Sequence, residues 1–182
     1  MEKIGVFCSA SDSISEVYFD KAEELGRWMG KQKKILVYGG ANLGLMKAIA
    51  QAVKLNGGKI IGVVPSKLEE NGKVSELPDD VLRTSNLSDR KDLLLQESDI
   101  MIALPGGIGT LDEIFHVMAS SSIGYHSKKI VFYNVDGFYD VLLGILGRLY
   151  ENQFARHPLD HYFCVANTFE ELTDILTSNN HD

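Results

Sequence analysis

The stretch that decides the fold is IMIALPGGIGT (residues 100–110), in which five apolar residues run into a turn rich in proline and glycine. A second stretch of the same kind, ILVYGGANLG (residues 35–44), occurs earlier in the chain. Each consists of a short apolar strand, a glycine turn and the start of a helical pattern. Strands that are apolar along their whole length are typical of parallel sheets, because helices cover both faces.

Strand and helix patterns alternate through the rest of the sequence. Strands are predicted at residues 4–8, 34–38, 59–64, 81–84, 100–104, 130–134 and 162–165. Helices are predicted at residues 15–32, 43–55, 88–97, 110–123, 138–151 and 168–177. The polar residues 66–80 contain an Asn-Gly pair and a proline, which predicts a surface loop. The alternation indicates an α/β fold: one doubly wound parallel sheet with helices on both faces, in a single domain over residues 1–182.

The two glycine turns predict a binding site for a phosphate-bearing ligand. Glycine lets the backbone approach a ligand closely, and the following helix offers unpaired N–H groups to an anion. Two such turns in one parallel sheet would open onto the same edge, where α/β sheets bind ligands. Glycine turns also close ordinary strand–helix units, so packing alone is the alternative. NAD is disfavoured, because Gly40 and Gly44 do not form G-x-G-x-x-G. The strand that ends at Val63-Val64-Pro65 also lacks the acidic residue expected on a ribose hydroxyl about 20 residues after the turn.

Composition restricts the partners that this chain can bind. The formal net charge is −7 and the pI is about 5.2, which argues against broad binding to nucleic acid or to an anionic membrane. Cys8 and Cys164 have no paired spacing, so we expect free thiols. With no secretory pattern near the start and no apolar run of about 20 residues, a cytoplasmic location is expected. The histidines form no metal-binding set, and His157 and His161 flank a proline.

Two charged groups near the glycine turns each allow two interpretations. Thr110-Leu111-Asp112-Glu113 fits a capping box, in which Glu113 bonds back to the Thr110 backbone. Alternatively, the Glu113 carboxylate faces a sugar ring and stabilises an oxocarbenium-like cation. Arg90 and Lys91 follow Ser88 at the start of a helix, where cations oppose the macrodipole. They form either a solvated basic pair or a clamp for an anion.

Seven motifs in this order resemble the LOG family of cytokinin riboside 5′-monophosphate phosphoribohydrolases, over about residues 3–176. The motifs are Val6-Phe7-Cys8, Tyr38-Gly39-Gly40, Gly44-Leu45-Met46, Ile61-Gly62-Val63, Arg90-Lys91, Pro105-Gly106-Gly107-Ile108-Gly109-Thr110-Leu111-Asp112-Glu113 and Asn134-Val135-Asp136-Gly137-Phe138-Tyr139. Such proteins have also been labelled lysine decarboxylases, but nothing in this sequence suggests a lysine site with pyridoxal phosphate.

The resemblance implies a Rossmann-like homodimer that cleaves the N-glycosidic bond of AMP or of N6-substituted AMP. The products would be a free base and ribose 5-phosphate, and no metal or redox cofactor is required. On matching positions, the resemblance assigns catalysis to Arg90 and Glu113. The substrate- and phosphate-binding residues that it implies are Gly40, Lys91, Gly106, Gly107, Gly109 and Thr110. The alternative function, from another class, is a non-catalytic carrier of a nucleotide or of the molybdenum cofactor.

The sequence departs from the family pattern at three places. Ala41 and Lys47 stand where the family often has glycine, and Ser88-Asp89 replaces a histidine followed by an acidic or amide residue. Residues 119–122 read Ala-Ser-Ser-Ser where many members read Thr-Trp-Ala-Gln, which favours AMP itself over its prenylated forms.

The helix predicted at residues 110–123 carries more apolar side chains than one buried stripe needs. Association through this helix is therefore expected, with burial among its own neighbours as the alternative. The apolar side chains are those of Ile114, Phe115, Val117 and Met118.

Overall fold

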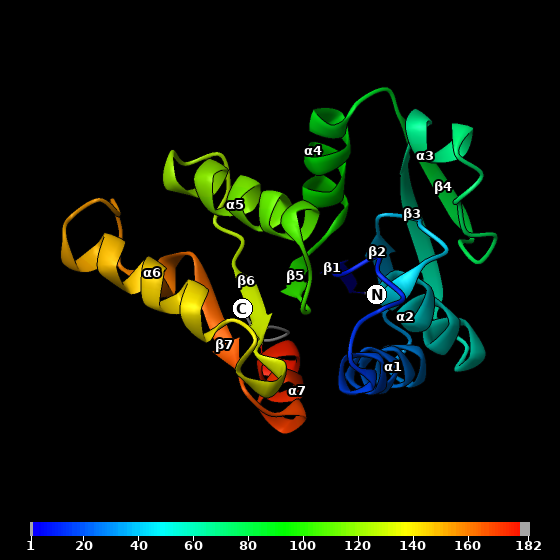
Figure 1. Ribbon diagram of the computed structural model, residues 1–182, viewed down its shortest axis with the longest axis horizontal. Coiled ribbons are helices and arrows are strands. Elements are labelled where there is room, and N and C mark those ends of the chain that lie inside the picture. The colour runs from blue at the N-terminus through cyan, green and yellow to red at the C-terminus, as the bar shows by residue number, and fades with distance from the viewer. Residues whose placement is uncertain (1, 179–182) are drawn as a thin grey trace.

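The computed structural model describes residues 2–178 and contains one seven-stranded sheet in which every pairing is parallel (Figure 1). The strand order is β4-β3-β2-β1-β5-β6-β7. The strands are β1 (Lys3–Phe7), β2 (Ile35–Tyr38), β3 (Lys59–Pro65), β4 (Asp80–Thr84), β5 (Ile100–Ala103), β6 (Ile130–Tyr133) and β7 (Phe163–Ala166). This arrangement confirms the α/β class and the parallel sheet predicted from the apolar strands.

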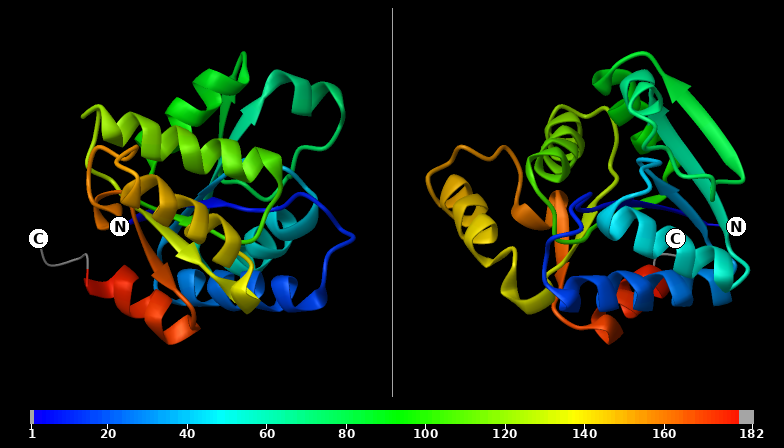
Figure 2. Two further views of the ribbon diagram at one scale, coloured as in Figure 1. Left: turned by 60° about the vertical axis from the view of Figure 1, so that its left-hand side comes forward. Right: turned by 45° about the vertical axis from the view of Figure 1, so that its right-hand side comes forward.

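Helices cover both faces of the sheet (Figure 2). One apolar cluster joins the sheet to α1, α2 and α7, and the other joins it to α4, α5 and α6. The helices are α1 (Glu16–Lys31), α2 (Gly44–Leu55), α3 (Ser66–Glu70), α4 (Leu87–Glu97), α5 (Ile108–Ser122), α6 (Asp140–Glu151) and α7 (Phe169–Ser178). Short 3-10 turns occupy Val135–Gly137 and Leu159–His161. No helix within residues 2–178 is both long enough and apolar enough to cross a membrane.

The chain changes direction across the sheet at β1. From β1 it builds outward through β2, β3 and β4, and then returns to the other side of β1 with β5. Val6 of β1 is therefore in register with Tyr38 of β2 and with Ile102 of β5. In doubly wound sheets this switch point leaves a crevice at the carboxyl ends of the strands. Both glycine turns open beside it, as their positions after β2 and β5 predict.

The prediction that residues 66–80 form a surface loop is wrong in part. Residues Ser66–Glu70 form helix α3, and Val74 makes an isolated antiparallel bridge with Ala41. The bridge is supported by the Asn42 N–H, which donates to the Lys73 carbonyl. The polar composition of the segment concealed these backbone pairings, because they do not depend on apolar side chains.

Two predicted helix starts are also corrected. Helix α4 is capped by Asn86, whose side chain accepts hydrogen bonds from the Ser88 and Asp89 N–H groups, so Ser88 does not open it. Helix α5 begins at Ile108 with Gly107 as its N-cap, so Thr110 is already inside the first turn.

Side chains of the motif at residues 134–139 form hydrogen bonds that hold the backbone just before the second glycine turn. The Asn134 side chain accepts a hydrogen bond from the Tyr139 N–H and donates to Asp140 and Asn167. The buried Tyr139 hydroxyl donates to the Leu104 carbonyl over 2.6 Å, immediately before the turn. Burial raises the pKa of Tyr139, so this donor remains protonated at neutral pH. The motif therefore fixes the end of β5.

Candidate active site

The second glycine turn presents the start of α5 to open space. The first N–H groups of a helix have no carbonyl partner within it, so those at residues 107–110 can receive an anion. A Cβ atom added at Gly107 or Gly109 would meet no atom within 4 Å. A Cβ at Gly106 would instead lie 2.1 Å from the Thr110 hydroxyl oxygen. Gly106 thus lets the Thr110 side chain pack onto the turn, while the other two glycines leave room for a ligand.

The first glycine turn is not free to bind an anion. The Gly44 N–H donates to the Asp12 carboxylate over 2.9 Å, and the Leu45 N–H donates to the Ser9 carbonyl over 2.9 Å. A Cβ at Gly44 would lie 2.6 Å from the backbone of Ala10. The loop after β1 therefore occupies the start of α2, and the expectation that both turns offer N–H groups to phosphate is wrong for this one.

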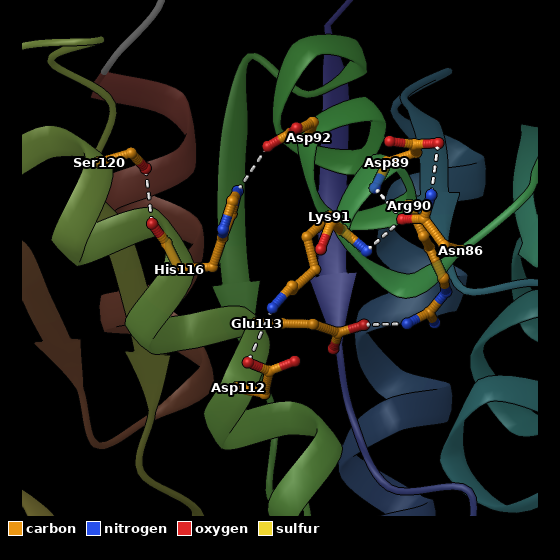
Figure 3. A network of polar contacts seen from close by, with 10 residues as sticks. Asn86, Asp89, Arg90, Lys91, Asp92, Asp112, Glu113, His116 and Ser120 are labelled. Carbon is orange, nitrogen blue, oxygen red and sulfur yellow. Dashed lines mark hydrogen bonds and ion pairs between the residues drawn. The ribbon is translucent and has the colours of Figure 1, made fainter.

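Arg90 and Glu113 form a shielded ion pair between α4 and α5 (Figure 3). The Arg90 Nη1 group donates to Glu113 Oε1 over 2.7 Å. Their side chains are only 13% and 5% exposed. Glu113 lies in the second turn of α5 and bonds across to α4, so the capping-box interpretation is wrong. The solvated-pair interpretation is likewise wrong for Arg90.

Burial raises the pKa of Glu113, and the positive charge and hydrogen bond of Arg90 oppose that rise. Burial dominates because the carboxylate has lost almost all of its water. The Arg90 Nε group is also buried and has no hydrogen-bond partner among the described residues. The pair therefore combines an oriented carboxylate of raised pKa with a guanidinium that does not use all of its hydrogen-bond donors within the described residues. Perturbed carboxyl groups of this kind are characteristic of catalytic sites.

A cavity of about 210 Å³ joins this pair to the second glycine turn. Its lining includes five of the eight predicted site residues. The lining residues are Cys8, Ser9, Ala10, Met46, Arg90, Gly107, Gly109, Thr110 and Glu113. We call this the switch-point cavity. Its lining residues come from the loop after β1 and the starts of α2, α4 and α5. The cavity therefore lies at the switch point of the sheet, where α/β proteins bind ligands.

Three predicted binding residues lie outside this lining: Gly106, which packs against Thr110 as described above, Lys91 and Gly40. Lys91 donates to Asp112 over 2.8 Å, one residue away from the central pair. Gly40 has a φ of +74°, and a Cβ there would lie 2.4 Å from Val64. Its conformation and packing thus explain the glycine without a ligand. Ligand contact by Gly40 stays a prediction.

Four residues that line the switch-point cavity were not predicted as site residues: Cys8, Ser9, Ala10 and Met46. Cys8 and Met46 belong to the quoted motifs at the end of β1 and the start of α2, whereas Ser9 and Ala10 belong to none. Both cysteines are free, as predicted. Burial raises the pKa of the Cys8 thiol, so it stays protonated and poorly nucleophilic. Among residues 2–178, no group of three or more His, Cys, Asp or Glu side chains is placed to hold a metal ion.

Gly39 was not among the predicted site residues, yet it makes room for the Arg90 guanidinium that pairs with Glu113. A Cβ at this position would lie 2.0 Å from Arg90 Nη2. We expect Gly39→Ala to displace the guanidinium from Glu113. A misplacement worth about 1.4 kcal/mol in the transition state lowers kcat/KM about tenfold, and we expect at least that loss.

The matched control is Gly144→Ala in α6, where an added Cβ meets nothing within 4 Å. It should retain the parent kcat/KM and thermal midpoint. Parent activity in a folded Gly39→Ala protein would show that the guanidinium position does not matter for turnover.

Fold and site together define a Rossmann-like α/β protein in which the start of α5 faces open space beside a buried Arg–Glu pair. The family model described as "Possible lysine decarboxylase" matches residues 46–177. The probable cytokinin riboside 5′-monophosphate phosphoribohydrolase LOGL2 of Oryza sativa subsp. japonica is 37% identical over 174 residues, covering 96% of this chain and 71% of the rice protein. The Arabidopsis thaliana phosphoribohydrolase LOG5 is 34% identical, covering 96% of this chain and 77% of its own. The chain belongs to the LOG family.

Solved structures share the fold at lower identity. The molybdenum cofactor carrier protein MCP from Chlamydomonas reinhardtii has a TM-score of 0.78 at 22% identity, covering 100% of this chain and 99% of its own. The molybdenum cofactor binding protein of Rippkaea orientalis has a TM-score of 0.74 at 23% identity, covering 98% and 96%. At such identities the likeness shows the fold alone.

Proposed function

We propose that this protein hydrolyses the N-glycosidic bond of adenosine 5′-monophosphate or its N6-substituted forms. The observation that carries this proposal is the Arg90–Glu113 pair, which lies in one cavity with an open helix start. A carrier would gain nothing from a buried carboxylate facing an anionic ligand. The names of the 34–38% identical relatives point to the same reaction. The carrier alternative has support only from fold likeness.

The proposed reaction breaks the bond between the anomeric carbon and the base nitrogen. The bonding electrons leave with the base, positive charge builds on the sugar, and the oxygen of a water molecule bonds to the anomeric carbon. One proton of that water is ultimately carried by the released base. The Glu113 carboxylate stabilises the sugar cation, and Arg90 holds the carboxylate in orientation. The N–H groups at the start of α5 and the Thr110 hydroxyl hold the 5′-phosphate.

This arrangement makes the phosphate essential. We expect kcat/KM for AMP to exceed that for adenosine by at least about a hundredfold, because two lost charge-assisted hydrogen bonds cost about 3 kcal/mol in total. The measurement is release of adenine from each substrate at matched concentration. Equal rates on the two substrates would contradict phosphate binding by the glycine turn.

We also propose that the protein forms a homodimer, although the sequence argument for it needs correction. Ile114, Val117 and Met118 are buried within the chain, so they are not surplus apolar surface. Phe115 is 42% exposed and lies beside an apolar groove of about 360 Å³ between α5 and α6. Exposed apolar side chains on and beside α6 extend this surface: Ile145, Leu149 and Phe154. Contiguous apolar surface of this kind marks interaction sites.

Light scattering at micromolar concentration tests the dimer. We expect twice the 20.1 kDa chain mass for the parent protein and a monomer for Phe154→Glu, because Phe154 is 79% exposed and a buried charge disfavours association. The control Leu55→Glu changes an exposed side chain at the end of α2, remote from the groove, and should remain dimeric. A monomeric parent protein would overturn the proposal.

A further inference from the structure

A second cavity, of about 300 Å³, lies against the second glycine turn. Its lining includes the aromatic residues Tyr18 and Phe138, so we call it the Tyr18/Phe138 cavity. Among the residues that line it, Ser9 and Gly107 also line the switch-point cavity. The boundary between the two cavities therefore consists of one residue from the loop after β1 and one from the glycine turn.

The backbone of Ser9 is bound on both sides by other parts of the chain. Its N–H donates to the Pro105 carbonyl over 3.1 Å, and its carbonyl accepts from the Leu45 N–H over 2.9 Å. The first bond holds Ser9 against the second glycine turn, and the second holds it against the first turn of α2. Both backbone polar groups are thus used within the chain, so Ser9 can bind a ligand only through its side chain.

The Ser9 hydroxyl has one unused hydrogen-bonding capacity. Its oxygen accepts a hydrogen bond from the Ser11 N–H over 3.1 Å, which forms a short turn of the kind that serine side chains make with the backbone two residues on. A hydroxyl also carries one proton to donate, and within residues 2–178 that proton has no acceptor. Ser9 is only partly buried, so this donor is available to a ligand at the boundary of the two cavities.

The charges around Ser9 suit an anionic ligand. Gly107, the other boundary residue, is the N-cap of α5, so an anion held by the start of that helix lies beside Ser9. Asp12 is the one acidic residue in residues 8–15, and its carboxylate accepts from the Gly44 N–H at the start of α2. That bond holds the negative charge of the loop at α2. The switch-point cavity also contains Arg90, whose buried Nε group has no partner among the described residues.

We propose that Ser9 is a phosphate-binding residue, whose hydroxyl donates a hydrogen bond to the 5′-phosphate of the substrate. This inference rests on the proposed function, which places the phosphate at the start of α5. The competing role of Ser9 is structural, in which its oxygen only maintains the turn with Ser11. The two roles differ in one respect: a donor to phosphate matters only for phosphorylated ligands, whereas a residue that shapes the loop matters equally for ligands without phosphate.

Calorimetric titration with ribose 5-phosphate tests the contact apart from turnover, because this probe has no bond to a base. We expect Ser9→Ala to bind it about tenfold more weakly than the parent protein, equivalent to 1.4 kcal/mol, since hydrogen bonds to charged groups are the strong ones. The matched control is Ser13→Ala. It removes a hydroxyl from an exposed residue of the same loop that lines neither cavity, and it should keep the parent affinity.

A second pair of variants keeps the turn and changes only the charge. Ser9→Asn and Ser9→Asp both retain an oxygen that can accept from the Ser11 N–H, because asparagine and aspartate side chains form the same kind of turn. The carboxylate adds a negative charge beside the phosphate, and like charges repel. We expect Ser9→Asp to bind ribose 5-phosphate at least about tenfold more weakly than Ser9→Asn. This comparison remains valid if Ser9→Ala loosens the loop.

Turnover gives the readout that a structural role would not produce. In Ser9→Ala, kcat/KM for AMP should fall about tenfold, whereas the value for adenosine should stay at that of the parent. Equal losses on the two substrates, equal affinities of Ser9→Asn and Ser9→Asp, or no binding of ribose 5-phosphate by the parent would overturn the role of Ser9. The proposed function fails separately, if the parent protein releases no base from AMP. In that case the binding of ribose 5-phosphate still decides whether Ser9 contacts phosphate.

Discussion

Glu113→Gln should give a folded protein that binds AMP and scarcely turns it over. The amide oxygen of glutamine can still accept the hydrogen bond from Arg90, so the link between α4 and α5 survives. The negative charge that stabilises the sugar cation is lost. Electrostatic contributions of this kind are worth about 3 kcal/mol or more, which corresponds to a loss of at least about a hundredfold in kcat. Adenine release measures the rate, and circular dichroism with thermal unfolding measures the fold.

The control is Asp112→Asn, which neutralises the adjacent carboxylate of α5. Asp112 is about half exposed and pairs with Lys91, so its loss should cost far less than the loss of Glu113. A Glu113→Gln protein that hydrolyses AMP at close to the parent rate would remove Glu113 from catalysis.

The pH dependence of the parent enzyme follows from the same carboxyl group. The proposed reaction needs ionised Glu113, and burial raises its pKa above the usual range near 4.3. Activity should therefore fall with acidification at a higher pH than an exposed glutamate would give. The stability sign is the opposite: a raised folded-state pKa contributes stability at low pH that is lost as the pH rises through that pKa. Both dependences should disappear in Glu113→Gln.

The sheet was predictable because its strands are apolar along their length and its helices have one apolar face. The second glycine turn was predictable as an anion site for the same local reason, since strand, turn and helix start are contiguous in sequence. The first turn looked equivalent but is not. The Gly44 N–H at the start of α2 donates to the side chain of Asp12, which is 32 residues away in the sequence. No local sequence pattern predicts that hydrogen bond.

The Arg90–Glu113 pair shows the same limit of prediction from local sequence patterns. Sequence spacing alone favoured Glu113 as a cap, because the true start of α5 at Ile108 depends on how Gly107 leaves β5. Only the resemblance to the LOG family paired Glu113 with Arg90. The requirement for Gly39 could not be predicted either, since it comes from the guanidinium of a residue on another helix. The roles of Glu113, Arg90 and Gly39 depend on contacts between different helices and strands. Local sequence patterns predict only the helices and strands themselves.

The loss of Arg90 should affect turnover even more than the loss of the carboxylate charge. Arg90→Ala removes both the partner that orients Glu113 and the main influence that holds down its pKa. The buried carboxyl then protonates instead of remaining as an unpaired charge, so the fold should persist. We expect kcat/KM to fall by about a thousandfold or more at neutral pH, since orientation and charge are lost together and such losses total about 4 kcal/mol.

Arg90→Lys separates charge from geometry. A lysine keeps the positive charge but lacks the planar guanidinium that donates to Glu113 and has further N–H donors. We expect an intermediate loss, with an acid limb of the pH–rate profile closer to that of the parent. In Arg90→Ala the residual activity should rise only at higher pH than in the parent, because the pKa of Glu113 rises further once the guanidinium is gone. A merely structural Arg90 would leave the position of that limb unchanged, so an unshifted profile in a folded Arg90→Ala protein would refute its role in tuning Glu113.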